Sequence, residues 1–294
     1  MTIDPEPPPE VIEPTPADTL VPVIWDGLDL NEGYRDDGML VIVTNVEGWY
    51  GTPVLDGHDL DLALTDGALA GVKTIHERLV TITGIANGPR LGCLLLSRQL
   101  AGKAAARLPV PLVVGEDGRA LTAAVRAGTE QMTHEWTGPV LFTYQVTLTA
   151  HDPRLYADGW EIAELTLGGS AATGRTYPRT YSWQYGAPTI DNSARLDNPG
   201  NVPAPVWAVY TGPLSATTLT DGRNTIRIAA LVAGQVLTVA TESLVAVAPG
   251  GATRASYVLA GSSAMTVPAN SIGTWSLYGS GTGYVELQWR AAYL

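Results

Sequence analysis

One pattern constrains the second half of this sequence more than any other: short apolar, β-branched runs recur at intervals of roughly ten residues, separated by clusters of Gly, Pro, Asn and Ser. The runs occupy 206–210, 225–229, 236–240, 274–278 and 284–289. Strands of this length, with no helical period between them, indicate an antiparallel sandwich or jelly roll. We place this domain at 156–294. Gly279-Ser280-Gly281-Thr282-Gly283 lies between two runs, with no helix after it that could bind phosphate, and is predicted to be a hairpin turn.

Residues 20–155 predict a separate β-rich α+β domain. The β-branched runs 39–43 and 79–83 are bounded by turn residues. Two strands flank the turn Gly115-Glu116-Asp117-Gly118. From Val140 to Leu148 apolar residues alternate with Thr and Gln, so this strand should have one buried face and one wet face.

A single helix is expected in the first domain, between Pro89 and Arg107. Apolar side chains recur on one face of it, and proline is suited to the first helical position. Lys103 and Arg107 would complement the dipole at the helix C-terminus, and Pro109 would stop the helix. The residues expected on the buried face are Cys93, Leu96, Leu100 and Ala104.

Residues 1–19 differ in character from both domains. They contain six prolines and five acidic residues and no basic residue. Such a segment buries too little apolar surface to offset its ordering entropy, so we expect an extended, polyproline-like arm. It could drape over a neighbouring subunit or serve as a ligand for a proline-recognition domain.

Charge and cysteine content narrow the function further. A net charge of −12 argues against a general nucleic-acid binder. One cysteine, Cys93, excludes an intrachain disulfide and a multi-thiolate metal site. No apolar run is long enough to span a bilayer, and the N-terminus is acidic where an export signal would be basic, so we expect a soluble protein without membrane insertion.

The sequence contains none of the catalytic or metal-binding motifs that would indicate an enzyme. The histidines are far apart and lack metal-ligand spacing, and the acidic cluster at 56–61 lacks the glycine and late glutamate of an EF-hand, so a solvated loop is expected there. Two acid pairs, Glu161 with Glu164 and Asp158 with Glu161, could be considered as a glycosidase dyad, but proximity in the sequence does not establish the required geometry. No nucleophile elbow occurs, and Cys93 lies in an apolar stripe. We therefore predict no catalytic residues, no metal and no cofactor.

Several segments taken together resemble distal tail proteins of siphophages, the minor tail proteins at the tail tip of phages that infect high-GC Gram-positive hosts. In the first domain the resemblance lies in Trp25-Asp26-Gly27, 46–53, 76–82 with the following helix, and His151-Asp152-Pro153-Arg154-Leu155-Tyr156. In the second it lies in 198–206, 225–228, 233–241, 267–275 and 289–294. The arm at 1–19 is not part of it.

This resemblance implies a structural virion protein at the distal end of the phage tail, made in the host bacterial cytoplasm. The family forms a hexameric ring that joins the tail tube to the tail tip, with the N-terminal domain lining the ring and a galectin-like sandwich pointing outward. The implied partners are copies of the chain, the tail tube protein, hub or baseplate proteins and the tape-measure protein. DNA would pass through the lumen without stable binding, which the acidic net charge favours.

Aromatic residues supply the candidate sites, since eight Trp and twelve Tyr accompany a single Phe, and Trp and Tyr suit half-wet surfaces. Trp49, Tyr50 and Pro53 are candidates for the subunit interface, or else fill the core. The alternative function is a carbohydrate-binding module that contacts the host envelope. Its candidate glycan platform is Tyr181, Trp183 and Tyr185.

Overall fold

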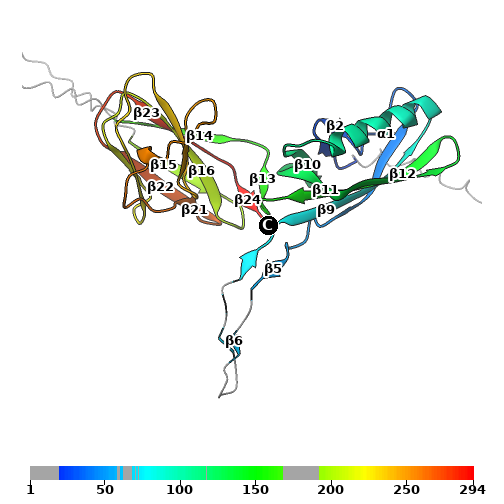
Figure 1. The fold of residues 1–294 in the computed structure, drawn as a ribbon, viewed down its shortest axis with the longest axis horizontal. Helices are drawn as coiled ribbons and strands as arrows, with labels where there is room; N and C mark the ends of the chain where they lie inside the picture. Colours follow the sequence, from blue (N-terminus) through cyan, green and yellow to red (C-terminus); the bar gives the residue numbers. More distant parts are fainter. Residues whose placement is uncertain are drawn as a thin grey trace, which may run out of the picture. The chain divides into compact units, whose positions relative to one another are not determined.

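The computed structural model describes residues 20–57, 60–61, 68–69, 71, 73–116, 118–167 and 192–294, so the predicted arm at 1–19 lies outside the described residues. The chain divides into two compact units, Met1–Asp152 and Pro153–Leu294 (Figure 1). The sequence placed this division at 155/156. Each unit is built around antiparallel strands.

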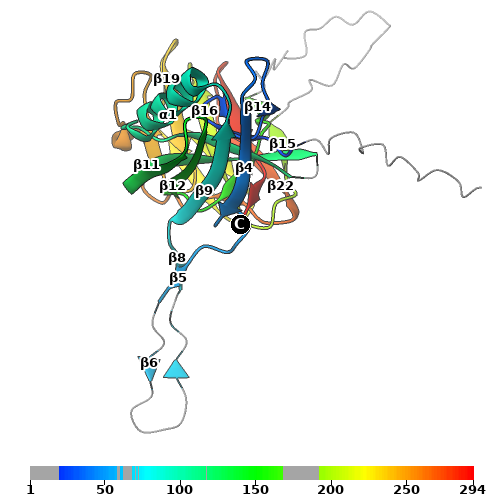
Figure 2. The ribbon, with the colours of Figure 1, turned by 90° about the vertical axis from the view of Figure 1, so that its right-hand side faces the viewer.

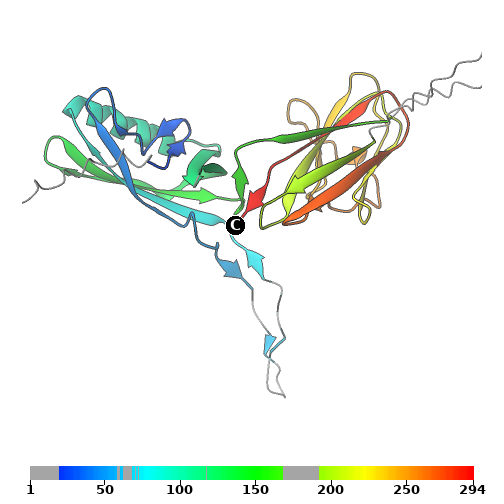
Figure 3. The same cartoon turned by 180° about the vertical axis from the view of Figure 1, so that it is seen from behind.

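The first unit is a twisted antiparallel sheet with strand order β2-β1-β10-β11-β12-β9-β4-β3. Helix α1 (Arg90–Ala104) packs across one face, against β11 and β12 (Figures 1 and 3). The strands are β1 (Val23–Trp25), β2 (Leu28–Asp29), β3 (Gly33–Tyr34), β4 (Leu40–Glu47), β9 (Arg78–Asn87), β10 (Val110–Glu116), β11 (Arg119–Thr137) and β12 (Leu141–Ala150).

The helix-covered face of this sheet forms the core of the unit. Along β12 the side chains of Phe142, Tyr144, Val146 and Leu148 are buried, and the intervening Thr and Gln side chains lie on the opposite face, as the alternation predicts. The expected helix is confirmed, and its buried residues are Cys93, Leu96, Leu100 and Ala104.

The ends of α1 differ in detail from the expectation. Pro89 is the N-cap, with extended backbone, and not the first helical residue. The Lys103 ammonium, expected to complement the helix dipole, also binds the turn that follows β1. It donates to the Asp26 carbonyl oxygen at 2.6 Å and contacts the Asp26 carboxylate at 2.9 Å. This bond ties the last turn of the helix to the turn after β1.

A two-stranded ribbon leaves the sheet between β4 and β9 (Figure 2). Strand β5 (Leu55–Asp56) pairs with β8 (Thr74–Ile75), and β6 (Leu60–Asp61) pairs with β7 (Ala68–Leu69). Asp56 and Asp61 of the expected solvated loop therefore lie on strands, while His58 and Asp59 lie outside the described residues. A ribbon was missed because two-residue ladders leave almost no periodic signal.

The second unit is the expected sandwich. One sheet has the order β14-β23-β16-β19-β20, with β21 also on β16, and the other has the order β15-β22-β17-β18. A short pair, β13 with β24, joins the first and last strands of the unit. The elements are β13 (Leu155–Ala157), β14 (Glu161–Thr166), β15 (Ser193–Asn198), β16 (Ala204–Thr211), β17 (Thr217–Thr220), β18 (Thr225–Ile228), β19 (Val236–Ala240), β20 (Val245–Val247), η1 (Ala255–Tyr257), β21 (Thr266–Val267), β22 (Ser271–Tyr278), β23 (Tyr284–Trp289) and β24 (Ala292–Tyr293).

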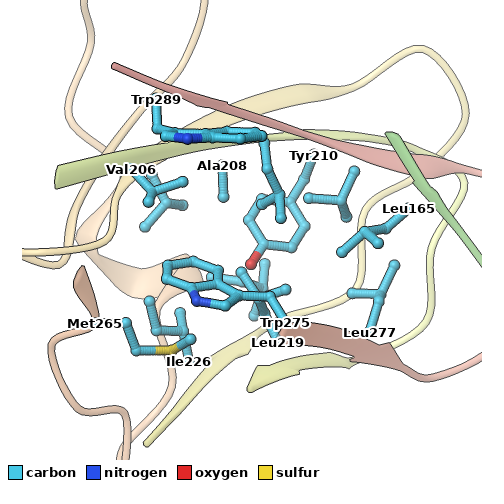
Figure 4. Close-up of a cluster of buried hydrophobic side chains, with 14 of the residues drawn as sticks. Leu165, Val206, Ala208, Tyr210, Leu219, Ile226, Met265, Trp275, Leu277 and Trp289 are labelled. Carbon is cyan, nitrogen blue, oxygen red and sulfur yellow. The ribbon is translucent and has the colours of Figure 1, made fainter. Parts of the chain in front are cut away.

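Large side chains from both sheets meet in the core of the sandwich (Figure 4). Tyr210 comes from one sheet and Trp275 from the other, and both are fully buried. Burial raises the pKa of the Tyr210 phenol well above its ordinary value, because a phenolate there would lose its hydration. Many of the Trp and Tyr residues that could have marked a surface are therefore core residues.

The glycine-rich segment 279–283 is not a hairpin turn, and this expectation was wrong. It links β22 to β23, which lie in different sheets. A Cβ at Gly283 would lie 2.1 Å from the Thr211 carbonyl oxygen, and one at Gly281 would lie 2.5 Å from that of Pro213. The glycines are needed because the link crosses closely over another loop.

Asn198 joins several segments of the sandwich through its buried side chain. Its amide nitrogen donates to the carbonyls of Val202, Val267 and Pro268, at 2.8, 3.2 and 3.1 Å. Its oxygen accepts from the Gly200 and Ala292 amides, at 3.1 and 3.2 Å. This residue begins the Asn-Pro-Gly-Asn sequence that contributed to the resemblance, and its role is structural.

Candidate functional site

The ribbon is anchored at its base by a buried arginine. Arg78 begins β9 directly after the ribbon and is only 1% exposed. Its Nη1 donates to the carbonyl oxygens of Gly48, Trp49 and Gly51, at 2.9, 2.6 and 2.8 Å. Burial lowers the pKa of the guanidinium from its usual value. One side chain therefore holds the strand that returns from the ribbon against the bend through which the chain enters it.

The first residue of the bend, Gly48, can only be glycine. Gly48 has φ +79°, and a Cβ there would lie 2.0 Å from the Leu79 carbonyl oxygen. Glycine lets the chain leave β4 and still approach β9 closely. The backbone and Arg78 together define the direction of the ribbon.

The three residues predicted for a subunit interface occupy this bend, but only one is on the surface. Trp49 is fully buried in the core of its own unit, and Pro53 is also buried. Tyr50 is 66% exposed. The bend is thus anchored by Trp49 on the inside and presents Tyr50 on the outside, and an interface role for the three residues stays a prediction.

Four other exposed apolar side chains lie on the ribbon or next to its base in the chain. Leu55 and Ile75 are cross-strand partners on the ribbon, so their side chains share a face. Val54 and Leu79 are 72% and 57% exposed. We call Tyr50, Val54, Leu55, Ile75 and Leu79 the ribbon-base patch. Sequence reasoning missed four of its members, because exposure cannot be read from apolar residues that flank a turn.

The face of the sheet opposite α1 carries a row of hydroxyls. We define the hydroxyl face as Thr81, Thr83, Thr143, Gln145, Thr147 and Thr149, all of which alternate with core residues on β9 and β12. The Thr81 and Thr147 hydroxyls lie 3.4 Å apart. None of these six residues carries a charge, but strand register places Glu47, Arg126 and Glu135 beside Thr81, Thr149 and Thr143 on the same side of the sheet.

A recess of about 670 Å³ opens beside the C-terminal end of α1. Its lining includes Glu77, His151, Arg107 and Arg126. His151 Nδ1 lies 3.8 Å from a Glu77 carboxylate oxygen, and both side chains are about half exposed. Charges of both signs surround an open space, and Thr149 supplies the one hydroxyl of its lining.

The remaining chemical candidates are not brought together. Glu161 faces Trp289 across the strand pair, on the inner side of the sheet, whereas Glu164 faces Glu286 on the outer side, so Glu161 and Glu164 do not flank a common cleft. Among the described residues, no group of three His, Cys, Asp or Glu could hold a metal ion. In the same part of the chain, no helix is long and apolar enough to cross a membrane.

His76 pairs with Asp56 at 3.1 Å on the ribbon. This contact lowers the pKa of the exposed Asp56 carboxyl, since the hydrogen bond from His76 favours its charged form. The predicted glycan platform of Tyr181, Trp183 and Tyr185 lies outside the described residues.

The two units, one a sheet crossed by a helix and the other a sandwich, share their fold with proteins of a phage hub and of a phage baseplate. The SPP1 Dit protein, described as a paradigm of the hub adsorption apparatus in phages that infect Gram-positive bacteria, is similar with a TM-score of 0.62 and 14% identity, over 94% of this chain and 100% of that chain. A chain of the activated phage p2 baseplate with Ca is similar with a TM-score of 0.52 and 11% identity, over 92% and 97%. A chain of the same baseplate with Sr is similar with a TM-score of 0.51 and 11% identity, again over 92% of this chain and 97% of that chain. No protein-family model and no curated protein matches the chain.

Proposed function

We propose that this chain is a structural protein of a phage tail, a distal tail hub that forms a hexameric ring between the tail tube and the tail tip. Support comes from the shared fold, which covers both units and nearly the whole length of each neighbour. The proteins it resembles in fold belong to a hub and to a baseplate. The proposed role is architectural and not catalytic.

The ribbon-base patch is the observation that carries the ring. Five apolar side chains, on the ribbon, on its bend and at the start of β9, remain in contact with water in the single chain, and grouped apolar exposure of this kind marks association surfaces. The patch stands on a bend fixed by Arg78 and Trp49. A projecting apolar surface suits a head-to-tail contact, which closes into a ring when its rotation divides a full turn.

The hydroxyl face is the part of the first unit that we assign to the ring lumen. Its threonines and Gln145 are partly exposed and uncharged. Its strand-register neighbours include two carboxylates, Glu47 and Glu135, and one arginine, Arg126. Such a wall would bind phosphate weakly, because DNA affinity comes largely from lysine and arginine contacts. DNA and a tape-measure protein could then pass without being held. The tail tube and tip proteins would contact the two sides of the ring.

The test is the mass of the purified full chain, by light scattering after gel filtration, together with negative-stain images of the same peak. We expect ring-shaped particles with a mass near six times 31.0 kDa. Leu55→Ser combined with Ile75→Ser should yield monomers with an unchanged melting temperature, since both side chains are already exposed. Val232→Ser, at an exposed apolar residue of the second unit, is the matched control and should leave the ring intact.

A wild-type chain that stays monomeric alone and with tail tube protein would refute the ring. Rings that persist in the double variant would show that the ribbon-base patch is not the contact.

A further inference from the structure

An exposed tryptophan on the second unit is held in a stack of aromatic and cationic groups. Trp160 is 51% exposed, and the Arg290 guanidinium carbon lies 4.6 Å from its ring centroid. The same guanidinium lies 4.8 Å from the ring of Tyr156. Trp207 meets Trp160 edge to face, with centroids 5.3 Å apart and an interplanar angle of 75°. These contacts restrict the orientation of the Trp160 ring while half of its surface remains in water.

Polar side chains continue from this stack along the outer face of the same sheet. Strand register places Gln288 between Ile162 and Trp207 in one row. Glu164 and Glu286 are direct partners in the next row. The residues between them along each strand, such as Leu165 and Leu287, point into the core, so the row members share the outward side. Gln288 Nε2 donates to a Glu286 carboxylate oxygen.

Folding alone does not account for this arrangement. Two like charges directly opposite each other weaken a strand pair, and a half-exposed Trp leaves much of its apolar area in water. Replacing either glutamate would relieve that repulsion, so the carboxylate pair is kept at a cost to the strand pairing. A binding surface often gathers, on one face of a sheet, side chains that lower the stability of the fold.

We propose that this face binds a neutral saccharide. We call Trp160, Trp207, Glu164, Glu286 and Gln288 the aromatic platform. The exposed Trp160 ring supplies the flat apolar surface on which the C–H face of a pyranose stacks. The Gln288 amide lies one outward row from Trp160, and the Glu164 and Glu286 carboxylates lie two rows away, about 13 Å along the strand. These groups would accept and donate hydrogen bonds to the hydroxyls of the next sugar units of an oligosaccharide.

The charge of the platform selects among sugars. Glu164 and Glu286 repel uronates and phosphate-bearing polymers, because an anionic ligand would add a third negative charge beside them. Arg290 stacks against both Tyr156 and Trp160, so its cation lies at the aromatic end of the face, four residues along the chain from Glu286. Neutral hexoses and N-acetylhexosamines are the classes that remain. This site is separate from the predicted one at Tyr181, Trp183 and Tyr185, and it does not depend on the ring.

The experiment is a titration of the full chain with a panel of oligosaccharides of neutral hexoses, N-acetylhexosamines, uronic acids and sugar phosphates, followed by tryptophan fluorescence and calorimetry. We expect binding in the neutral or N-acetylated classes only. Trp160→Ala should weaken it about ten-fold or more, which corresponds to about 1.4 kcal/mol. Trp160→Phe should retain part of the affinity, because a flat ring is still present. Glu164→Gln should let anionic sugars bind without abolishing neutral ones.

Tyr278→Ala supplies the matched control, since Tyr278 is 56% exposed on the other sheet of the sandwich. It should leave binding unchanged, and thermal melting should show that both it and Trp160→Ala stay folded. The proposal is overturned if no sugar in the panel binds the folded wild-type chain, or if binding survives Trp160→Ala unchanged. It is also overturned if Trp160→Ala instead blocks incorporation of the chain into tails, because the face would then be a protein contact. None of these results bears on whether a ring forms.

Discussion

Replacing Arg78 with methionine tests whether one side chain holds the base of the ribbon. Methionine keeps most of the apolar stem but removes the donor that three carbonyl oxygens share, at 2.6 to 2.9 Å. A hydrogen bond from a charged group contributes about 1.5–3 kcal/mol, and one nitrogen has two hydrogens to donate, so the gross loss is about 3–6 kcal/mol. Relief of the buried charge offsets part of it, and we expect a net loss of about 3 kcal/mol.

Urea unfolding of the full chain, followed by far-ultraviolet circular dichroism and tryptophan fluorescence, measures this loss for the first unit. Hydrogen exchange should locate it, with faster exchange at the amides of the bend 48–51 than elsewhere in the sheet. Arg78→Lys should be intermediate, because an ammonium keeps the charge but not the reach of the planar guanidinium.

Arg126→Met is the matched control, at an exposed arginine of the same sheet, and should shift stability by no more than about 0.5 kcal/mol. If Arg78→Met resembled Arg126→Met in stability and in exchange at 48–51, the reasoning that the arginine fixes the bend would be refuted.

Three further predictions concern the two cores. Asn198→Ala should lower the unfolding free energy of the sandwich by about 3 kcal/mol, because five hydrogen-bonded backbone groups lose their partner; a denaturant midpoint equal to that of wild type would contradict this. Gly84→Ala should cost about 2 kcal/mol, since a Cβ there would lie 2.3 Å from the Tyr144 ring, and an unchanged melting temperature would show that the ring moves aside freely. Burial raises the pKa of both Tyr144 and Tyr210, so their contribution to stability is complete below about pH 10 and is lost as pH rises, by about 1.4 kcal/mol per pH unit for each. Tyrosinate absorbance should therefore show these two of the twelve tyrosines titrating only on unfolding, and a single transition of all twelve in the folded chain would contradict it.

The local elements of this protein were largely predictable. Helix α1 was recognised because four apolar residues repeat at the helical period before a proline, and that period depends only on neighbours in the chain. Strands β12, β19 and β23 were located for the same reason, from alternation and from the Gly and Pro residues that bound them.

The candidate sites were predicted less well. The sequence offers Trp49 and Tyr50 alike as interface candidates, yet Tyr50 is exposed and its neighbour Trp49, of the same chemical type, is fully buried. Composition cannot separate the two, because Trp and Tyr suit both a core and a half-wet surface. The aromatic platform was missed since Trp160, Trp207 and Arg290 are far apart in sequence and meet only when β14, β16 and β23 pair.

The amino-acid order by itself indicated the β-rich class, the helix, the sandwich and the alternation of buried and exposed faces. Each of these leaves a signal in the period or spacing of residues that are close in the chain. Tertiary structure alone decided that 279–283 crosses between sheets and that Arg78 caps a bend 27 to 30 residues away. It also decided which apolar side chains remain in water. These features depend on which distant segments become neighbours, and that choice follows from the packing energy of the whole chain and not from any local period.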